Sequence, residues 1–183
     1  MKNPLLSGNR SAIVLTVAAA GVAFAGIRLY AQRENVAGIR NFTKADGQIA
    51  CGGATDPSAV PELAKRGFKT LISLREDGET GAQTAAVDQA ARAAGLRFIH
   101  VAMSAQAPSE SSASAALAAL RDGGNQPVFI YDASGSRAAA IVMIKRILAD
   151  GWPEDRAYNE AVSIGLSSPG LKAFVLDYVA RHK

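Results

Sequence analysis

The sequence has little of the residue types that form disulfides and metal sites, with one cysteine and two histidines among 183 residues. A single cysteine, Cys51, excludes an intramolecular disulfide framework and a metal site made of several cysteines. His100 lies in a strand-like run and His182 lies next to the C-terminal residue, so the two give no metal-ligand cluster. We therefore predict neither a metal nor another cofactor, and we expect Cys51 to be a small buried hydrophobic residue.

A large excess of basic residues is also missing from most of the chain, although the formal net charge is +4. Residues 1–44 contain six basic side chains and one acidic one, whereas residues 45–183 contain 14 basic and 15 acidic ones. Nucleic-acid-binding domains need a broad basic face that neutralises phosphates. The balanced charge after residue 44 therefore predicts that nucleic acid is not a partner.

A run of 17 residues without charge, Ser11–Ile27, lies between two arginines near the N-terminus. At a rise of about 1.5 Å per residue it would be roughly 25 Å long as a helix, the short end of what spans a bilayer. We predict that residues 1–32 form a hydrophobic signal-anchor helix, which makes this a single-pass membrane protein with an extracytoplasmic domain. The alternative is secretion after signal-peptide cleavage near Ala25, because Ala23-Phe24-Ala25 resembles a small-x-small cleavage site.

After this segment, residues 33–45 read as a polar linker and residues 46–183 as one domain. Strand patterns alternate with helix patterns along that domain, which predicts the α/β class. We expect a mainly parallel central sheet of four to five strands, flanked by helices on both faces. The predicted strands are Gln48–Cys51, Phe68–Leu74, Leu96–Ala102 and Val128–Tyr131. The predicted helices are 59–65, 80–94, 111–121, 137–150, 153–164 and 169–181.

The most informative segment is the small-residue loop between the last predicted strand and an apolar helix. The loop is Asp132–Ser136, and Arg137 opens the helix. Consecutive loop N–H groups, the positive end of a helix dipole and an arginine together form a cradle for an anion. Ligands of α/β folds bind where strands end and helices begin. We therefore predict a phosphate-binding site made of Ala133, Ser134, Gly135, Ser136 and Arg137.

The same loop resembles a known family. Asp132-Ala133-Ser134-Gly135-Ser136-Arg137 is similar to the contracted Cys-x-x-Gly-x-Arg phosphate loop of a bacterial branch of the cysteine-based dual-specificity and tyrosine phosphatases. It differs at its first residue. The segments Asp46–Gly53 and Gly67–Arg75 resemble strands of that family, and the resemblance covers residues 41–165. Rhodaneses share a similar loop, but the upstream strands look more like those of phosphatases.

This resemblance implies a phosphatase-like fold in which Asp132 stands at the position of the catalytic nucleophile and Arg137 clamps the phosphate oxygens. In the family a second residue, usually Asp, protonates the leaving oxygen from the loop after the strand Leu96–Ala102. That loop has no Asp here, and we expect Glu110 to belong to the start of the next helix. Two of the family's three chemical roles therefore have no clear counterpart in this sequence.

An ionised Asp132 would pair with Arg137 or with the loop amides and would oppose phosphate binding. Two like charges about 4 Å apart cost roughly 4 kcal/mol at an effective dielectric constant near 20. We therefore predict a membrane-anchored, catalytically impaired module that binds phosphate or a partner protein, with a phosphate-containing small molecule or a phosphoprotein as the ligand. A loop kept only for folding is one alternative. The other is an active phosphomonoester hydrolase with a non-cysteine nucleophile, Asp132, Ser134 or Ser136.

Overall fold

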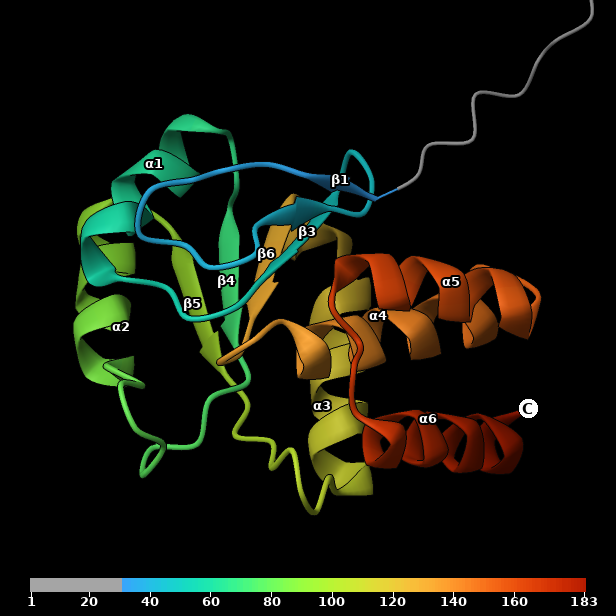
Figure 1. Cartoon of the computed structure of the whole chain (residues 1–183). Helices are drawn as coiled ribbons and strands as arrows, with labels where there is room; N and C mark the ends of the chain where they lie inside the picture. Colours follow the sequence, from blue (N-terminus) through green and yellow to red (C-terminus); the bar gives the residue numbers. More distant parts are fainter. Residues whose placement is uncertain (1–30) are drawn as a thin grey trace, which may run out of the picture.

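The apolar runs predicted as strands form the centre of a sheet in the computed structural model, which describes residues 31–183 (Figure 1). The sheet has six strands in the order β1-β2-β3-β6-β4-β5. Strands β3, β6, β4 and β5 pair in parallel, whereas β1, β2 and β3 pair antiparallel. The strand bounds are β1 Gln32–Arg33, β2 Thr43–Lys44, β3 Ile49–Gly52, β4 Thr70–Ser73, β5 Arg97–His100 and β6 Val128–Tyr131. The predicted α/β class, with parallel strands at the centre of the sheet, is confirmed.

Helices cover both faces of this sheet, α1 and α2 on one face and α3 to α6 on the other (Figure 1). Alternate side chains of β6 explain this, because Phe129 and Tyr131 pack with α1 and α2 while Val128 and Ile130 pack with the other helices. The helices are α1 Val60–Lys65, α2 Thr84–Ala93, α3 Glu110–Arg121, α4 Ser136–Leu148, α5 Glu154–Ile164 and α6 Pro169–His182. Short 3-10 turns lie at Pro57–Ala59 and Gly123–Asn125.

Helix α4 is the central helix of its layer. It packs against α3, α5 and α6 as well as the sheet, and every residue from Ser136 to Ile144 is buried. The sequence is apolar around the whole circumference of this helix, which is the pattern of a buried element. The burial of α4 fixes the position of the loop at its N-terminus.

The prediction of a polar linker at residues 33–45 was wrong. This segment contributes β2 and the end of β1, and it buries Val36, Ile39 and Phe42. The Phe42 ring is fully buried and stacks on Phe129 of β6, with 5.6 Å between the ring centroids. The polar residues that suggested a linker alternate with these apolar ones. The domain therefore begins before residue 46, and the sheet has two more strands than the four that were predicted by name.

The remaining sequence predictions concern Cys51, metals and the N-terminus. Cys51 is free and fully buried in β3, as expected, and burial together with nearby carboxylates raises the pKa of its thiol. Residues 31–183 contain no group of three or more histidine, cysteine or acidic side chains arranged for a metal ion.

The predicted membrane helix lies, up to residue 30, outside the described residues. No helix within residues 31–183 has the length and apolar character needed to cross a membrane.

Candidate functional site

The loop Asp132–Ser136 leaves the carboxyl end of β6, between its two parallel neighbours. Tyr131, the last residue of β6, lies opposite Gly52 of β3 and Ser73 of β4. Gly135 has φ +96°, a backbone conformation that favours glycine, and it is the N-cap residue of α4. The sequence prediction of a strand, a tight turn and a helix start at these residues therefore describes the local backbone.

Neighbouring segments hold the outside of this loop. The Ala54 N–H donates to the Ala133 carbonyl at 3.1 Å, and Asn41 Nδ2 donates to the Ser134 carbonyl at 3.0 Å. A Cβ atom on Gly53 would lie 3.0 Å from the Ala133 carbonyl oxygen, so glycine permits the close approach. The carbonyls of Ala133 and Ser134 thus point outward to partners beyond the loop. The N–H groups of Ser134 and Gly135 point to the inside of the loop.

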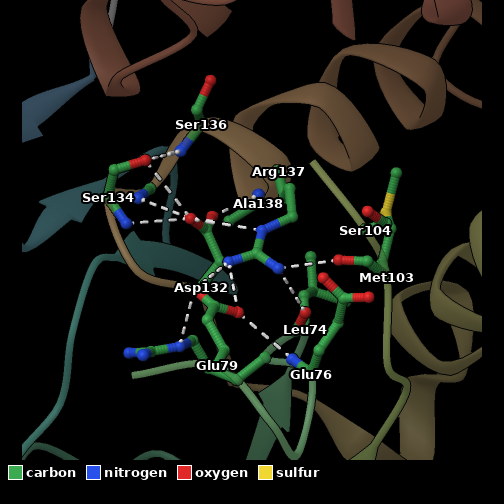
Figure 2. A network of polar contacts seen from close by, with 12 residues as sticks. Leu74, Glu76, Glu79, Met103, Ser104, Asp132, Ser134, Ser136, Arg137 and Ala138 are labelled. Carbon is green, nitrogen blue, oxygen red and sulfur yellow. Dashed lines mark hydrogen bonds and ion pairs between the residues drawn. The ribbon is translucent and has the colours of Figure 1, made fainter. Parts of the chain in front are cut away.

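The carboxylate of Asp132 occupies the inside of the loop (Figure 2). Its Oδ1 accepts hydrogen bonds from the N–H groups of Ser134 at 2.9 Å and Gly135 at 3.1 Å. Its Oδ2 accepts a hydrogen bond from the Ala138 N–H at 2.9 Å. The residue is only 1% exposed. The donors that would hold a bound anion therefore bind a carboxylate of the chain itself.

The Arg137 guanidinium is also fully engaged, and it is 3% exposed. Nη1 donates to the carbonyls of Leu74 at 3.1 Å and Met103 at 2.7 Å. Nη2 donates to both carboxylate oxygens of Glu79, at 2.7 and 2.9 Å. Nε faces Asp132 Oδ1 at 3.6 Å. Arg137 thus reaches the loop through Nε, while its other two nitrogens bind groups outside the loop.

Glu79, which was not predicted as a site residue, comes from the segment between β4 and α2. Besides Arg137 it pairs with Arg75 Nε at 3.0 Å, and its Oε2 accepts the Glu76 N–H at 3.2 Å. A signal for it exists in the sequence, because the segment Glu76-Asp77-Gly78-Glu79 has three acidic residues and begins three residues after the buried strand β4 ends. Side chains at the ends of neighbouring parallel strands meet at one edge of a sheet.

Glu79→Gln is expected to lower stability near neutral pH by roughly 1–2 kcal/mol, because it removes a charged hydrogen-bond acceptor from Arg137. Burial alone would raise the pKa of Glu79, but hydrogen bonds from Arg137 and Glu76 and the charges of Arg137 and Arg75 lower it below its ordinary value. A carboxyl group with a lowered pKa stabilises the folded state at pH values above its unfolded-state pKa of about 4.3. This stabilisation is lost as the pH falls through the pKa of the group in the folded state. Denaturant unfolding of both proteins between about pH 3 and about pH 7 measures this. A stability difference that does not change with pH would contradict the expectation.

The loop hydroxyls bind groups of the loop and its surroundings, and Ser134 Oγ donates to Asp132 Oδ1 at 3.4 Å. Ser134 Oγ accepts the Ser136 N–H at 3.3 Å, and Ser136 Oγ accepts the Ser167 N–H at 3.3 Å. The loop after β5 contributes the Met103 carbonyl to Arg137 and contains no acidic residue between 101 and 109. Glu110 is the first residue of α3, as predicted, and pairs with Arg181 and His182. The site therefore has an anion cradle but no carboxyl group from that loop.

Comparisons with known proteins agree with this architecture. Residues 38–149 match the family profile of the phosphatase-like domain of the beta-lactamase hydrolase-like protein. None of the curated proteins compared with the chain matches it. The crystal structure of TpbA from P. aeruginosa is similar with a TM-score of 0.65 and 18% identity, over 86% of this chain and 92% of that chain. A variant of TpbA has been solved in complex with phosphotyrosine.

A second similar structure is the catalytic core of the PP-IP phosphatase SIW14 from S. cerevisiae, in complex with citrate. It has a TM-score of 0.65 and 18% identity, over 80% of this chain and 93% of that chain. At this level of identity the two structures establish the fold alone. The family profile covers well over half of the chain and includes β3, β4, β5, β6 and the loop at Asp132. The chain therefore belongs to the family of the phosphatase-like domain of beta-lactamase hydrolase-like proteins, which is related to the cysteine-based phosphatases.

Proposed function

We propose that this domain is a non-catalytic phosphatase-like module whose anion cradle is closed by its own Asp132 carboxylate. Asp132 stands where the Cys-x-x-Gly-x-Arg loops of cysteine-based phosphatases have their nucleophile. The observation that carries the proposal is the set of three hydrogen bonds from the N–H groups of Ser134, Gly135 and Ala138 to this carboxylate. These three bonds use the backbone donors that an incoming anion would need.

The geometry argues against Asp132 as a nucleophile. Both of its oxygens accept backbone hydrogen bonds, and the side chain is 1% exposed. Its negative charge would also repel an incoming phosphate, at roughly 4 kcal/mol for charges about 4 Å apart and an effective dielectric constant near 20. Aspartyl-phosphate chemistry commonly relies on a metal ion to offset this repulsion. A hydrolase that uses Asp132 would have to expose the carboxylate and replace its hydrogen bonds first.

The proposed ligand class is a phosphate-containing group, on a small molecule or on a phosphoprotein. Support comes from the inward loop amides and from Arg137, and from the phosphotyrosine complex of the TpbA variant. In this chain such a ligand competes with Asp132 for the loop amides and with Glu79 for Arg137. We therefore propose that binding is weak in the wild-type protein and requires Asp132 to release its amides.

Turnover of para-nitrophenyl phosphate tests the catalytic half of the proposal, because its leaving group departs without a proton. We expect no turnover by the full-length wild-type protein, and measurable turnover by Asp132→Cys, whose thiolate would face the loop amides and Arg137. For substrates with poorer leaving groups the turnover rate of this variant should stay low, because no general acid protonates the leaving oxygen. General acid catalysis typically raises a rate by about 10²–10⁴-fold. Asp132→Ser, with a similarly small side chain but no thiolate, is the matched control and should be inactive. Wild-type turnover that disappears in Asp132→Ala would instead establish a hydrolase with a carboxylate nucleophile.

We also propose that the segment before β1 anchors the domain to a membrane as a signal-anchor, with the domain on the extracytoplasmic side; because Gln32 belongs to β1, the segment ends earlier than residue 32. The support is the uncharged run Ser11–Ile27 and its flanking arginines. Alkaline extraction of membranes from cells that express the full-length chain tests it. Retention of the intact chain in the membrane pellet is expected, and a soluble product that begins after Ala25 would establish cleavage instead.

A further inference from the structure

The short turn that leads to Glu79 carries an exposed Asp-Gly pair. The Glu79 N–H donates to the Glu76 carbonyl at 3.0 Å, which places Asp77 and Gly78 at the two central positions of a β-turn. The Asp77 side chain is 81% exposed, and the nearest ionisable side chain is that of His100, with Nδ1 at 3.8 Å. Among residues 31–183 this is the only polar contact of its carboxylate, and it is too long for a hydrogen bond. The Asp77 carboxyl group is thus free to approach the backbone nitrogen of Gly78.

The chain has three other Asp-Gly pairs, and each has an engaged carboxylate. Asp46 accepts the Gln48 and Ile49 N–H groups and pairs with Arg146. Asp150 accepts hydrogen bonds from Lys145 and Arg146, and Asp122 caps the 3-10 turn Gly123–Asn125 through the Gly124 N–H. Hydrogen bonds of this kind hold a carboxylate away from other reactions, most strongly where the donor is charged. Asp77 differs from all three in this respect.

We propose that Asp77-Gly78 is a site of spontaneous isoaspartate formation, and that this modification releases Glu79 from Arg137 and Arg75. The Gly78 nitrogen attacks Cγ of the protonated Asp77 carboxyl group, a C–N bond forms, and one water leaves with the carboxyl oxygen and the amide proton. Water then opens the resulting succinimide. Cleavage at the Cα carbonyl leaves the chain running through Cβ, which is isoaspartate, and cleavage at the other carbonyl restores Asp77. No co-reactant other than water is required.

The modification adds one methylene to the main chain inside a turn that is closed by a single hydrogen bond. The longer turn cannot keep both the Glu79 N–H to Glu76 bond and the Glu76 N–H to Glu79 Oε2 bond at 3.2 Å. Glu79 is the residue that holds two buried arginines, Arg137 at 2.7 Å and Arg75 at 3.0 Å. Isoaspartate formation at Asp77 thereby removes the carboxylate that neutralises Arg137, the arginine next to the loop.

The first test is site-resolved detection of isoaspartate. The full-length protein is kept at neutral pH and physiological temperature, labelled by isoaspartyl methyltransferase with labelled S-adenosylmethionine, digested and mapped by mass spectrometry. We expect label at position 77 to accumulate about tenfold faster or more than at Asp46, Asp122 or Asp150, which corresponds to a barrier lower by about 1.4 kcal/mol. Equal or slower accumulation at position 77, or none, would overturn the proposal.

Gly78→Ala is the matched variant, because a Cβ added there meets no atom within 4 Å and the side chain hinders attack by the neighbouring nitrogen. It should abolish most of the label at position 77 and leave the other three positions unchanged. Gly47→Ala, which is equally unobstructed, should leave position 77 unchanged. For the second half of the proposal, modified and unmodified protein are separated and their amide hydrogen exchange is compared. Faster exchange at Glu79 is expected, and equal exchange in the two forms would overturn the release of Glu79.

Discussion

Arg146→Ala is expected to destabilise the protein by about 3–5 kcal/mol, because it leaves a buried carboxylate without its cation. Arg146 in α4 is 5% exposed, and it donates to Glu160 through Nε at 2.7 Å and through Nη2 at 3.1 Å. The Glu160 side chain, in α5, is itself only 7% exposed. The expected loss is therefore that of a broken buried ion pair, and it is larger than that for any exposed pair in the molecule.

The same guanidinium binds two further carboxylates and an aromatic ring. Nη2 donates to Asp46 at 2.8 Å, Nη1 donates to Asp150 at 3.0 Å, and the guanidinium carbon lies 4.6 Å from the centroid of the Trp152 ring. Burial alone would lower the pKa of Arg146, but Glu160 and the two aspartates raise it above its ordinary value. Arg146 thus joins α4 to α5 and to the turn before β3.

A double-mutant cycle measures the pair. Urea unfolding of the full-length wild-type protein is compared with Arg146→Ala and with the cycle Arg146→Met, Glu160→Leu and Arg146→Met/Glu160→Leu. The double variant should recover much of the loss, because it removes both buried charges and keeps the apolar volume. Arg92→Ala, which breaks an exposed i,i+4 pair with Asp88, is the control and should change little. A loss in Arg146→Ala no larger than in this control would contradict the assignment of Arg146 as a structural centre.

The parts of the fold that the sequence predicted are those with local patterns. The alternation of strand and helix, the buried helix after the loop and the glycine at the turn all depend on residues close together in the chain. Gly135 at φ +96° and the fully buried stretch of α4 illustrate this. Residues 33–45 were misjudged for the same reason. Phe42 is buried by Phe129 and Phe68, and neither of these partners is close to it in sequence.

The candidate site was predictable in its backbone and not in its charge pairing. Asp132, the loop amides and Arg137 lie within six consecutive residues, so a cradle and a possible internal acceptor could be inferred from the sequence. The Asp132 carboxylate could accept hydrogen bonds either from the loop N–H groups or from the Arg137 guanidinium. Which of the two it binds depends on the other partners of Arg137. The answer lies in Glu79 and in the carbonyls of Leu74 and Met103, which come from two other strand ends. Because these partners satisfy Arg137, Asp132 is free to accept the loop N–H groups.

Asp132→Ala is expected to convert the loop into a phosphate site while it lowers stability. Removal of the carboxylate leaves the N–H groups of Ser134, Gly135 and Ala138 without their acceptor, and each unsatisfied buried group costs about 1–3 kcal/mol. Inorganic phosphate can then supply oxygens to these groups and to Arg137 Nε. At a concentration 100-fold above its dissociation constant it would restore about 2.7 kcal/mol, or a rise in melting temperature of about 2–4 °C per kcal/mol for a chain of this size.

The measurement is the melting temperature of the full-length protein in increasing phosphate, with sodium chloride at matched ionic strength as the reference. The wild-type protein should show no phosphate-specific rise, because Asp132 already fills the loop. Asp46→Ala is the matched control, since it also deletes a carboxylate that pairs with an arginine, but away from the loop. It should lose stability without gaining any response to phosphate.

An equal rise in the wild-type protein would show that Asp132 does not close the cradle. A folded Asp132→Ala protein without any rise would show that the loop is not an anion site. The response to phosphate therefore tests the closure by Asp132 and the cradle itself separately.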